Sequence, residues 1–515
     1  MLVMGPGCRA KMAVTASTVP VALYCSVRLT GSRSRRSQRI SALDLSRWQF
    51  GITTVYHFFM VPLTIGLSVL VAWFNTRWYR HGDEADLRLT KFFGKLFMIN
   101  FALGVATGLV QEFQFGMNWA GYSRFVGDVF GAPLAMEGLV AFFVESTFIG
   151  LWVFGWGRLS KRVHLATIWI AAFGSWASAY FIIAANSFMQ HPVGVQYNAE
   201  RGRAEMTSIW EILTNPTTLA AYPHVIAASV VTGAVFVGSV SAWYLARGQA
   251  QTEVDIRGFR RALRTATVVT LVAGVAVLFT GDQQARMMFE QQPMKMVSAE
   301  ALCETEKGAG ISVLAIGDVS NRCDVRSLVI PGVLAFMATG SFDGTVTGVN
   351  ELQADMTEKY GENDYRPPLV VTYWSFRGMI GFGLMGMIAS VWVLWRVRHR
   401  ESIGPRKWTA RLALAIMWTP FLANAFGWIL TEMGRQPWVV APNPDGVYEV
   451  RLLTRDAVSA AATSTSVWIS LITFTVLYGG LAVAEIYLLR RYIRKGLDDS
   501  LVADLKPDAE PALAY

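Results

Sequence analysis

The sequence is short of charged residues. Only 16% of its 515 residues are Asp, Glu, Lys or Arg, whereas 53% are hydrophobic and the mean hydropathy is +0.35. Soluble domains carry about 25% charged residues, so a soluble protein of this length would lack polar groups to cover its surface. The composition therefore excludes a soluble enzyme, a disordered scaffold and a collagen-like fibre.

Cysteine is also scarce. Of the four cysteines, Cys303 and Cys323 lie 20 residues apart in one polar segment, and the sequence contains neither a CxxC motif nor a zinc-ligand spacing. If that segment lies outside the cell membrane, a disulfide between these two residues is permitted and would stabilise the fold by about 3 kcal/mol. Two free thiols are the alternative.

The net charge of +9 does not indicate nucleic-acid binding. No basic stretch is interleaved with aromatic residues, as a nucleic-acid surface would require. In a membrane protein, an excess of Lys and Arg is typical of cytoplasmic loops. We therefore expect the lipid bilayer, and no nucleic acid, among the partners.

The sequence contains long apolar segments with few charged residues. About 20 apolar residues suffice to cross the hydrocarbon as a helix. The runs are continuous rather than alternating, which favours helices over the strands of a barrel. The sequence predicts an all-α integral membrane protein, a bundle of about nine transmembrane helices. They lie at 49–75, 94–112, 131–155, 164–188, 217–245, 265–281, 370–395, 411–431 and 466–489.

Basic residues set the expected orientation. Alternate short loops hold 23 Lys and Arg residues, against 6 in the opposite loops. Because basic loops stay in the cytoplasm, we expect the N-terminus outside and the C-terminus cytoplasmic. The expected organisation is membrane helices 1–6 at 43–281, an extracytoplasmic segment at 282–369, helices 7–9 at 370–490 and a cytoplasmic tail at 491–515.

Residues 1–42 do not fit this scheme. They place several arginines on the outer side, and they form neither an apolar span nor a clean signal peptide. We interpret them as an over-extended gene start, with a disordered N-terminal extension as the alternative.

A few ionisable or soft side chains fall inside the spans, where such groups are costly and usually functional. His57 and His224 lie in the first and fifth spans, and each is either a packing histidine or a ligand of haem iron. Met379 begins the seventh span, where it either fills the core or serves as the same kind of ligand.

Three carboxylates add to this set. Glu137 and Glu145 lie eight residues apart in the third span, a rise of about 12 Å and a rotation of about 80° on an α-helix. They face broadly the same side and suit a proton path, unless basic groups of another span pair with them. Glu432 lies at the end of the eighth span. It either caps the helix at the membrane interface or serves as a metal ligand. The outer halves of their spans also hold His57, His224, Met379 and Glu137. This shared depth indicates a layer of cofactors near the outer face of the membrane.

Long blocks of the sequence resemble subunit I of cytochrome bd quinol oxidase, of the short quinol-loop type. They are FGKLFMINFALGVATGLVQEFQFGMNW, GDVFGAPLAMEGLVAFFVESTFIGLWVFGW and TEMGRQPW, and the likeness extends over about 43–490. QQPMKMVSAE resembles the start of that family's quinol loop. The later half of segment 282–369 departs from the long-loop members.

The resemblance implies a low-spin haem b, a high-spin haem b and a haem d. Positions matching the family's haem ligands are His224 and Met379 for the low-spin haem, and His57 and Glu432 for the two high-spin haems, with no assignment of which holds haem d. Arg377, Arg435 and Trp428 match residues beside the haems. Glu137 and Glu145 match acids of the proton path, and Lys295 and Glu300 match loop residues linked to quinol oxidation.

The implied function is a quinol:O₂ oxidoreductase of an aerobic respiratory chain, in the bacterial cytoplasmic membrane. It would oxidise menaquinol or ubiquinol, reduce O₂ to water and contribute to the proton-motive force by vectorial proton uptake. A second membrane subunit, subunit II, and small single-span accessory subunits are the implied partners. The alternatives are a transporter or ion channel with intramembrane carboxylates, or a cytochrome b that only relays electrons.

Overall fold

All nine predicted spans are helical. The computed structural model describes residues 41–248, 252–318, 324–399 and 407–497, and within these ranges nine helical segments are long and apolar enough to cross a membrane. These segments are α1 (Ala42–His81), α2 (Glu84–Gly116), α3–η1–α4 (Ala120–Met136, Glu137–Phe142, Phe143–Phe154), α5 (Lys161–Gln190), α6–α7 (Ile209–Leu213, Pro216–Arg247), α8 (Glu253–Gln291), α12 (Leu369–His399), α13–α14 (Lys407–Met417, Thr419–Met433) and α16 (Ser464–Lys495). The all-α membrane fold is confirmed.

The helices are longer than the apolar runs that predict them. The sixth span, expected at 265–281, is the middle of α8, which covers Glu253–Gln291. Residues 282–291, expected to open the outer segment, therefore continue this helix. Apolar content reports only the part of a helix that meets hydrocarbon, whereas backbone hydrogen bonds continue until a cap or a break ends it. Residues 1–40 and 498–515 lie outside the described residues.

The third span is not a regular α-helix. Val126 has non-helical backbone angles, and a π-helix, η1, begins at Glu137 and ends at Phe142. The expected rotation of about 80° between Glu137 and Glu145 assumes α geometry, so it does not apply here. Single π-turns inside α-helices are rare overall, but those that occur are often found at functional sites. Glu137 lies at the midpoint of the segment Ala120–Phe154 rather than in its outer half.

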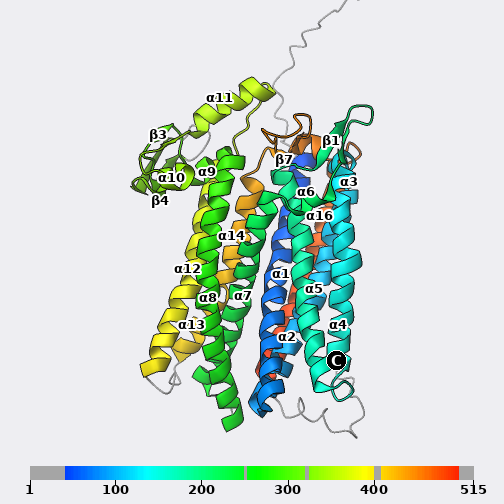
Figure 1. Cartoon of the computed structure of the whole chain (residues 1–515), viewed down its shortest axis with the longest axis vertical. Coiled ribbons are helices and arrows are strands. Elements are labelled where there is room, and N and C mark those ends of the chain that lie inside the picture. The colour runs from blue at the N-terminus through cyan, green and yellow to red at the C-terminus, as the bar shows by residue number, and fades with distance from the viewer. Residues whose placement is uncertain (1–40, 249–251, 319–323, 400–406, 498–515) are drawn as a thin grey trace, which may run out of the picture. The chain divides into compact units, whose positions relative to one another are not determined.

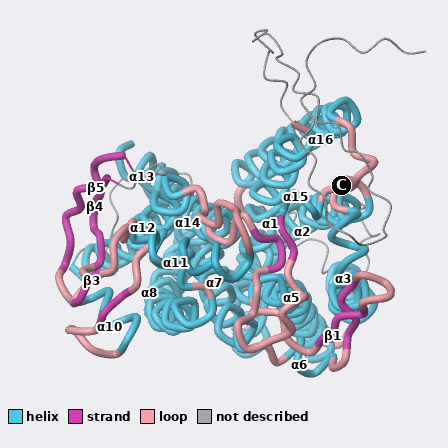
Figure 2. Tube along the Cα trace, turned by 90° about the horizontal axis from the view of Figure 1, so that it is seen from above, coloured by secondary structure: helices cyan, strands magenta, loops and turns pink. Residues whose placement is uncertain are grey.

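Two groups of helices pack side by side (Figures 1 and 2). In one group α1 packs on α2, α5 and α16, and α4 packs on α5; in the other, α7 packs on α8 and α13, and α12 packs on α8 and α14. Contacts of α1 with α7 and α14 join the groups. We call the end that carries α9 (Pro293–Glu300) and α11 (Val349–Tyr360) the loop end, and the end where α1, α7 and α16 finish the basic end.

Short elements cover the loop end. Within the described residues, two-stranded antiparallel sheets pair β1 with β2, β3 with β6, β4 with β5 and β7 with β8. Their bounds, with the remaining helices, are β1 (Val195–Asn198), β2 (Arg203–Met206), β3 (Glu306–Lys307), β4 (Ile311–Asp318), β5 (Asp324–Ile330), α10 (Val333–Thr339), β6 (Thr345–Val346), β7 (Trp438–Val440), β8 (Leu452–Leu453) and α15 (Thr454–Ala457). Cys303 is disulfide-bonded; Cys323 lies outside the described residues, so their pairing stays a prediction.

The two helix groups meet where two glycines cross. A Cβ atom on Gly66 of α1 would lie 2.2 Å from the carbonyl oxygen of Ser229, and one on Gly233 of α7 would lie 2.5 Å from the backbone of Gly66. Small residues at helix crossings let backbones approach closely in membranes. Leu67, beside Gly66, is completely buried. This contact fixes α1 against α7 and so sets the positions of the side chains that both helices carry.

Replacing Gly66 by Ala should weaken this contact, because the added methyl group collides with backbone atoms that cannot rotate away. We expect a destabilisation of about 1–3 kcal/mol, the usual effect of overpacking, measured as a lower thermal unfolding midpoint in detergent. Gly480→Ala is the matched control, since a Cβ there meets no atom within 4 Å. Equal midpoints for the two variants would contradict the proposed role of the crossing.

Candidate functional site

Helix α14 is the junction of the candidate site. A Cβ atom on Gly427 would lie 3.0 Å from the sulfur of Met379 on α12, so the two helices touch at the methionine. The next residue, Trp428, stacks on Phe58 of α1 with ring centroids 4.9 Å apart. Glu432, one turn further on, reaches α5. One face of α14 therefore brings three predicted site residues together at the loop end.

The carboxylate of Glu432 is held by a chain of polar side chains. Asn186 of α5 donates to Oε1 at 2.8 Å, and Arg435 donates to Oε2 at 2.5 Å. Gln190 donates to Asn186 Oδ1 at 2.8 Å and accepts a hydrogen bond of 2.7 Å from Lys295 Nζ. The chain Lys295–Gln190–Asn186–Glu432 thus ties the short helix α9 to the end of α14.

Lys295 and Glu300 face different parts of the structure, although both belong to α9. The stem of Lys295 packs against Gly434, whose Cβ would lie 2.8 Å from Lys295 Cγ. Burial and the nearby Arg435 guanidinium lower the pKa of Lys295 to about 7, while Glu432 opposes them. Lys295 therefore belongs with the Glu432 cluster rather than with Glu300.

Glu300 pairs instead with Arg377 at the start of α12. Arg377 Nη2 lies 2.6 Å from Glu300 Oε2, and the guanidinium also donates to the backbone carbonyls of Ala299 and Ser312. Ser312 donates its backbone N–H to the same carboxylate oxygen at 2.9 Å. Burial raises the pKa of Glu300, and Arg377 opposes this shift. Arg377 lies two residues before Met379, so this ion pair adjoins the methionine.

Both candidate histidines present the same ring nitrogen. His57 Nδ1 lies 2.8 Å from Thr107 Oγ1, and His224 Nδ1 lies 3.2 Å from Thr280 Oγ1. Each threonine hydroxyl donates its own proton to a backbone carbonyl of its helix, so it can only accept from the ring. This arrangement favours the tautomer with the proton on Nδ1, and within the described residues no hydrogen bond to Nε2 of either ring is found. His164 differs, because its Nε2 lies 2.9 Å from the carbonyl of Trp152.

Glycines make room beside these rings. A Cβ on Gly108 would lie 3.2 Å from His57 Cε1, and one on Gly281 would lie 3.2 Å from His224 Cε1. No group of three or more His, Cys, Asp or Glu side chains that could hold a bare metal ion occurs within 41–248, 252–318, 324–399 and 407–497. The donors stand singly, as expected for ligands of a cofactor that brings its own iron.

The two acids of the third span both face α5. Ser178 donates to Glu137 Oε1 at 2.6 Å, and Ser175 donates to Glu145 Oε1. Glu145 is 5% exposed. The partners are hydroxyl groups rather than the basic residues of the ion-pair alternative, so both carboxyls can gain or lose a proton without breaking an ion pair.

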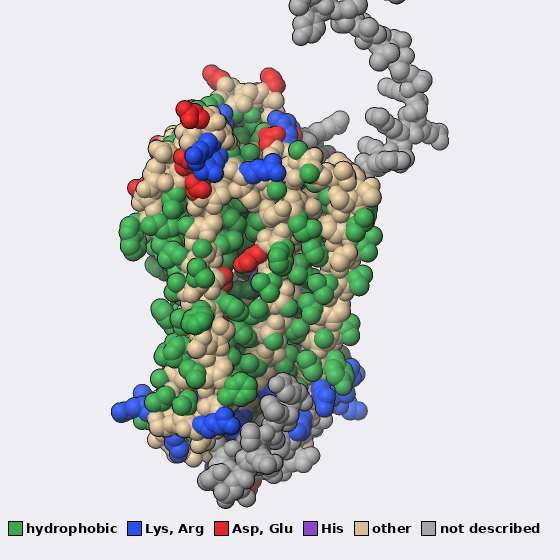
Figure 3. Space-filling view, turned by 90° about the vertical axis from the view of Figure 1, so that its right-hand side faces the viewer, with side chains coloured by type: hydrophobic (Ala, Val, Ile, Leu, Met, Phe, Trp, Pro, Cys, Tyr) green, Lys and Arg blue, Asp and Glu red, His purple; other side chains and the backbone are tan. Residues whose placement is uncertain are grey.

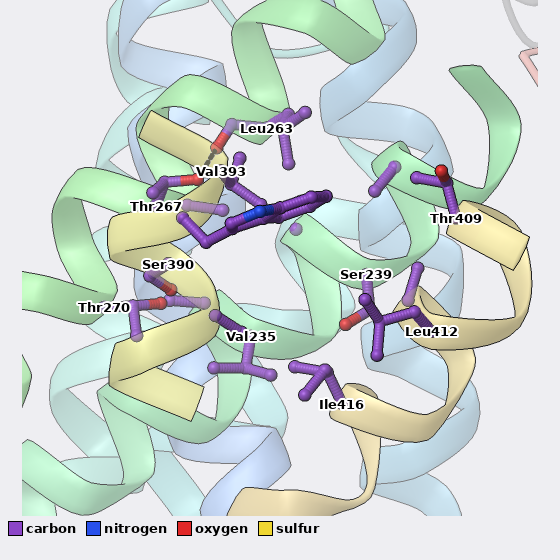
Figure 4. Close-up of a pocket in the computed structure, with 17 residues that line it drawn as sticks. Val235, Ser239, Leu263, Thr267, Thr270, Ser390, Val393, Thr409, Leu412 and Ile416 are labelled. Carbon is purple, nitrogen blue, oxygen red and sulfur yellow. Dashed lines mark hydrogen bonds between the residues drawn. The ribbon is translucent and has the colours of Figure 1, made fainter. Parts of the chain in front are cut away.

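A separate cavity of about 70 Å³ lies nearer the basic end, between α7, α8, α12 and α13 (Figure 4). Hydroxyl groups of Ser239, Thr267 and Ser390 and apolar side chains such as Leu412 line it. Since no lining residue is titratable, this cavity offers nothing to acid–base chemistry and stays outside the candidate site.

Comparisons with known proteins decide the family. The model of the cytochrome bd terminal oxidase subunit I family matches residues 45–497. The chain is 42% identical to the cytochrome bd ubiquinol oxidase subunit 1 of Bacillus subtilis, over 92% of this chain and 98% of that protein. It is 36% identical to the cytochrome bd-II ubiquinol oxidase subunit 1 of Escherichia coli, over 88% and 96%. The chain belongs to the cytochrome bd terminal oxidase subunit I family.

A solved structure agrees with this membership. The bd oxidase of Geobacillus thermodenitrificans matches with a TM-score of 0.77 at 28% identity, over 88% of this chain and 99% of that chain. This bd oxidase subunit is therefore a multi-pass protein of the bacterial cytoplasmic membrane, and its family uses haem cofactors.

Unpaired polar atoms of this bd oxidase subunit fit a haem. Among the described residues, Arg435 Nε and Nη1 and Trp428 Nε1 are buried without a hydrogen-bond partner. Native proteins rarely leave buried donors unpaired, and haem propionates are acceptors of the required charge. The three donors flank Glu432, so the fit is strongest there.

Sequence reasoning missed the residues that bond to the candidate site side chains or extend their hydrogen-bond chains: Thr107, Thr280, Asn186, Gln190, Ser175 and Ser178. They carry no formal charge, so a search of the spans for ionisable residues passes over them. The available signal was that an amide inside a span must find a partner within the bundle. That signal favours Asn186 and Gln190, which lie one turn apart near the end of the fourth span.

Because the pKa of Lys295 is lowered in the folded protein, the free energy of unfolding should depend on pH. Between pH 7 and 10.5 the unfolded chain holds a proton at Lys295 that the folded protein has lost, so stability rises with pH across this window. We expect the wild-type unfolding midpoint to rise relative to that of Lys295→Met over this range. The control is Lys307→Met, at an exposed position. Its unfolding midpoint should change with pH in the same way as that of the wild type. A constant difference between wild type and Lys295→Met would refute the assignment.

Proposed function

We propose that His57, His224, Met379 and Glu432 hold the haems with which this subunit works as a quinol oxidase. The protein is a quinol:O₂ oxidoreductase of the respiratory chain, and the transporter and electron-relay alternatives are not favoured. The observation that carries the residue assignment is that both histidines have Nδ1 engaged by threonine, while Nε2 has no hydrogen bond to the part of the chain that the structure describes. Such outer hydrogen bonds usually orient a metal-bound imidazole.

The proposed distribution follows from the helices. His224 and Met379 would hold the low-spin haem b, since two protein ligands leave no open position. His57 and Glu432 would each hold one of the two remaining haems, a high-spin haem b and a haem d, without a fixed order. Bound there, the haems would carry electrons from quinol to O₂. Arg435 and Trp428 would bind propionates through the unpaired donors beside Glu432.

The quinol site is proposed at the Glu300–Arg377 pair. Among the described residues Glu300 Oε1 has no hydrogen bond, whereas Oε2 is engaged by Arg377 and Ser312. Oε1 could accept a hydroxyl proton from quinol, and the raised pKa of Glu300 favours holding it. Lys295 would act at the other side of α9, by adjusting the charge around Glu432.

Proton uptake is proposed to run from the cytoplasm. Oxidation of two quinols releases four protons, and reduction of one O₂ to two waters consumes four. With the basic end cytoplasmic (Figure 3), the N-terminus outside and the C-terminus inside, protons reach the loop end through the membrane. Glu145 and then Glu137 would pass them along α5, with Ser175 and Ser178 as hydrogen-bond partners.

A second membrane chain is proposed on the face of α2, α3 and α4. Bd oxidases are multi-subunit membrane complexes, and subunit II would cover this face, with single-span accessory subunits beside it. Leu139 is 78% exposed and Phe143 66% exposed, and Glu112 is exposed near the end of α2. Figure 3 shows acidic atoms recessed in an otherwise hydrophobic face. A carboxylate facing lipid would be costly, which favours protein cover.

A reduced-minus-oxidised spectrum of the purified complex tests the haem assignment. Met379→Leu should remove the low-spin haem b signal and leave the other haem signals, because only that haem would lose one of its protein ligands. Met385→Leu on the same helix, at a 49% exposed side chain, should leave all signals unchanged.

An unchanged low-spin signal in Met379→Leu would reject that ligand. Absence of a far-red chlorin band from the wild type would reject haem d, and absence of every haem band would support the transporter alternative.

Thr107→Val should loosen the haem at His57. Without the hydroxyl acceptor, the His57 ring is no longer fixed, and loss of such an outer partner lowers metal affinity by about 10–100-fold. The haem content per protein and the high-spin signal should therefore fall. Thr473→Val is the control, since this exposed threonine bonds only to its own helix. Full haem content in Thr107→Val would refute the positioning role.

A further inference from the structure

Helix α16 buries an unusual set of residues. Its buried side chains are Val467, Ser470, Tyr478 and Glu485, so three of the four are polar. They lie on the face that packs on α1 and α2. The opposite face is apolar and exposed, with Val476 69% and Val483 70% exposed. The helix therefore turns its polar side away from lipid and into the bundle.

Two of these polar residues have definite partners. Ser470 donates to Gln49 Oε1 of α1 at 2.9 Å. Tyr478 donates from its hydroxyl to the carbonyl of Thr107 on α2 at 2.8 Å, and its ring packs on Tyr56 with centroids 5.1 Å apart. Tyr478 thus adjoins the threonine that fixes the His57 ring.

Glu485 has no such partner. It is 8% exposed, and no hydrogen bond or ion pair within the described residues reaches its carboxylate. It lies seven residues beyond Tyr478, about 10 Å nearer the basic end. Asn100 lies seven residues from Thr107 in the same direction on α2, so Glu485 and Asn100 are at one level. Asn100 Oδ1 is buried without a partner.

Polar groups continue from this level to His57. Asn100 donates to Thr64 Oγ1 of α1 at 2.7 Å. The Tyr56 hydroxyl is buried without a partner among the described residues. We call the set Glu485, Asn100, Thr64, Tyr56, Tyr478 and Thr107 the α16 seam. It leads from the middle of α16 toward the ring of His57.

Few titratable groups face Glu485. From α1 there is Tyr56, and on its own helix there is Tyr492, one further heptad along. From α2 there is Lys95, whose ammonium lies 4.4 Å from the centre of the Tyr492 ring. An ionised carboxylate buried without a counter-charge is costly, so such a group normally holds a proton. A carboxyl of this kind can exchange one proton with water without breaking an ion pair.

We propose that Glu485 is a second proton-accepting site of this subunit, which takes up a proton from the basic end and passes it along the α16 seam during O₂ reduction. This inference rests on the proposed function. The proton enters on the Glu485 carboxylate, leaves through the seam toward the oxygen-reducing site, and the carboxylate is restored for the next one. No oxidant or reductant is needed beyond quinol and O₂.

The α16 seam is distinct from the path of Glu145. Glu145 lies on α4 and bonds to α5, whereas α16 packs on α1 and α2. Glu485 lies ten residues before Lys495, the last residue of α16, and Glu145 lies nine residues before Phe154, the last residue of α4. The two buried carboxyls thus offer separate entries at similar depth.

The test is Glu485→Gln in the complete oxidase, which keeps the shape and removes the titration. Reduced-minus-oxidised infrared spectra should lose a protonated-carboxyl band that shifts in D₂O. Proton uptake, followed with a pH dye as the fully reduced enzyme reacts with O₂, should slow about tenfold or more. Haem content and haem spectra should stay unchanged, which separates this result from a failure of the haem assignment.

Ser470→Ala is the matched control, because it removes a polar contact from the same helix face but no titratable group. It should keep the infrared band and the uptake rate. A Glu485→Gln enzyme with the wild-type band and uptake would overturn the proposal. Should that variant not assemble, Glu485→Asp decides: a carboxyl band that moves in frequency supports the assignment, and a band identical to the wild type rejects it.

Discussion

The structure depends on one constraint, which is that polar side chains between membrane helices must find their partners inside the bundle. Hydrocarbon offers no hydrogen bonds, so an amide, hydroxyl or carboxyl placed there needs a partner on its own helix or on a neighbouring one. The interface of α1 and α2 shows this most clearly. Asn100, Thr107 and Gln114 of α2 each bond to a side chain of α1. The histidine that we assign to haem is one member of this series.

The same constraint explains the central position of α14. Within six residues this helix contacts Met379 of α12, Phe58 of α1 and Asn186 of α5. Helix α9 then joins both sides of the site, through Lys295 on one face and Glu300 on the other. A displacement of α9 would therefore disturb the contacts of both Glu432 and Arg377. Helix α9 at the loop end therefore connects to both sides of the candidate site.

The exceptions to this pairing are as informative as the pairs. Arg435 and Trp428 keep buried donors without an acceptor among the described residues, and they lie where an anionic cofactor edge is expected. Glu485 is a buried carboxyl without a counter-charge within the part of the chain that the structure describes, on a helix whose opposite side is mainly apolar. Unpaired donors indicate a missing acceptor, whereas an unpaired acid indicates a place for a proton. The unpaired donors therefore point to cofactor binding, and the unpaired acid points to proton transfer.

The sequence determined the number of spans, their helical form and the few ionisable residues within them, because apolar run length and side-chain cost in lipid are local properties. The third span was predicted as a regular helix, and its π-turn at Glu137 was not foreseen, since backbone register depends on packing against α5. Lys295 and Glu300 were grouped because both match loop residues linked to quinol oxidation in the family that the sequence resembles, yet α9 turns them to different neighbours. The role of Thr107 gave no signal in the sequence, and Glu485 was visible only as an acid within the ninth span, because partners and the rotation of one helix against another are decided only by contacts between distant parts of the chain.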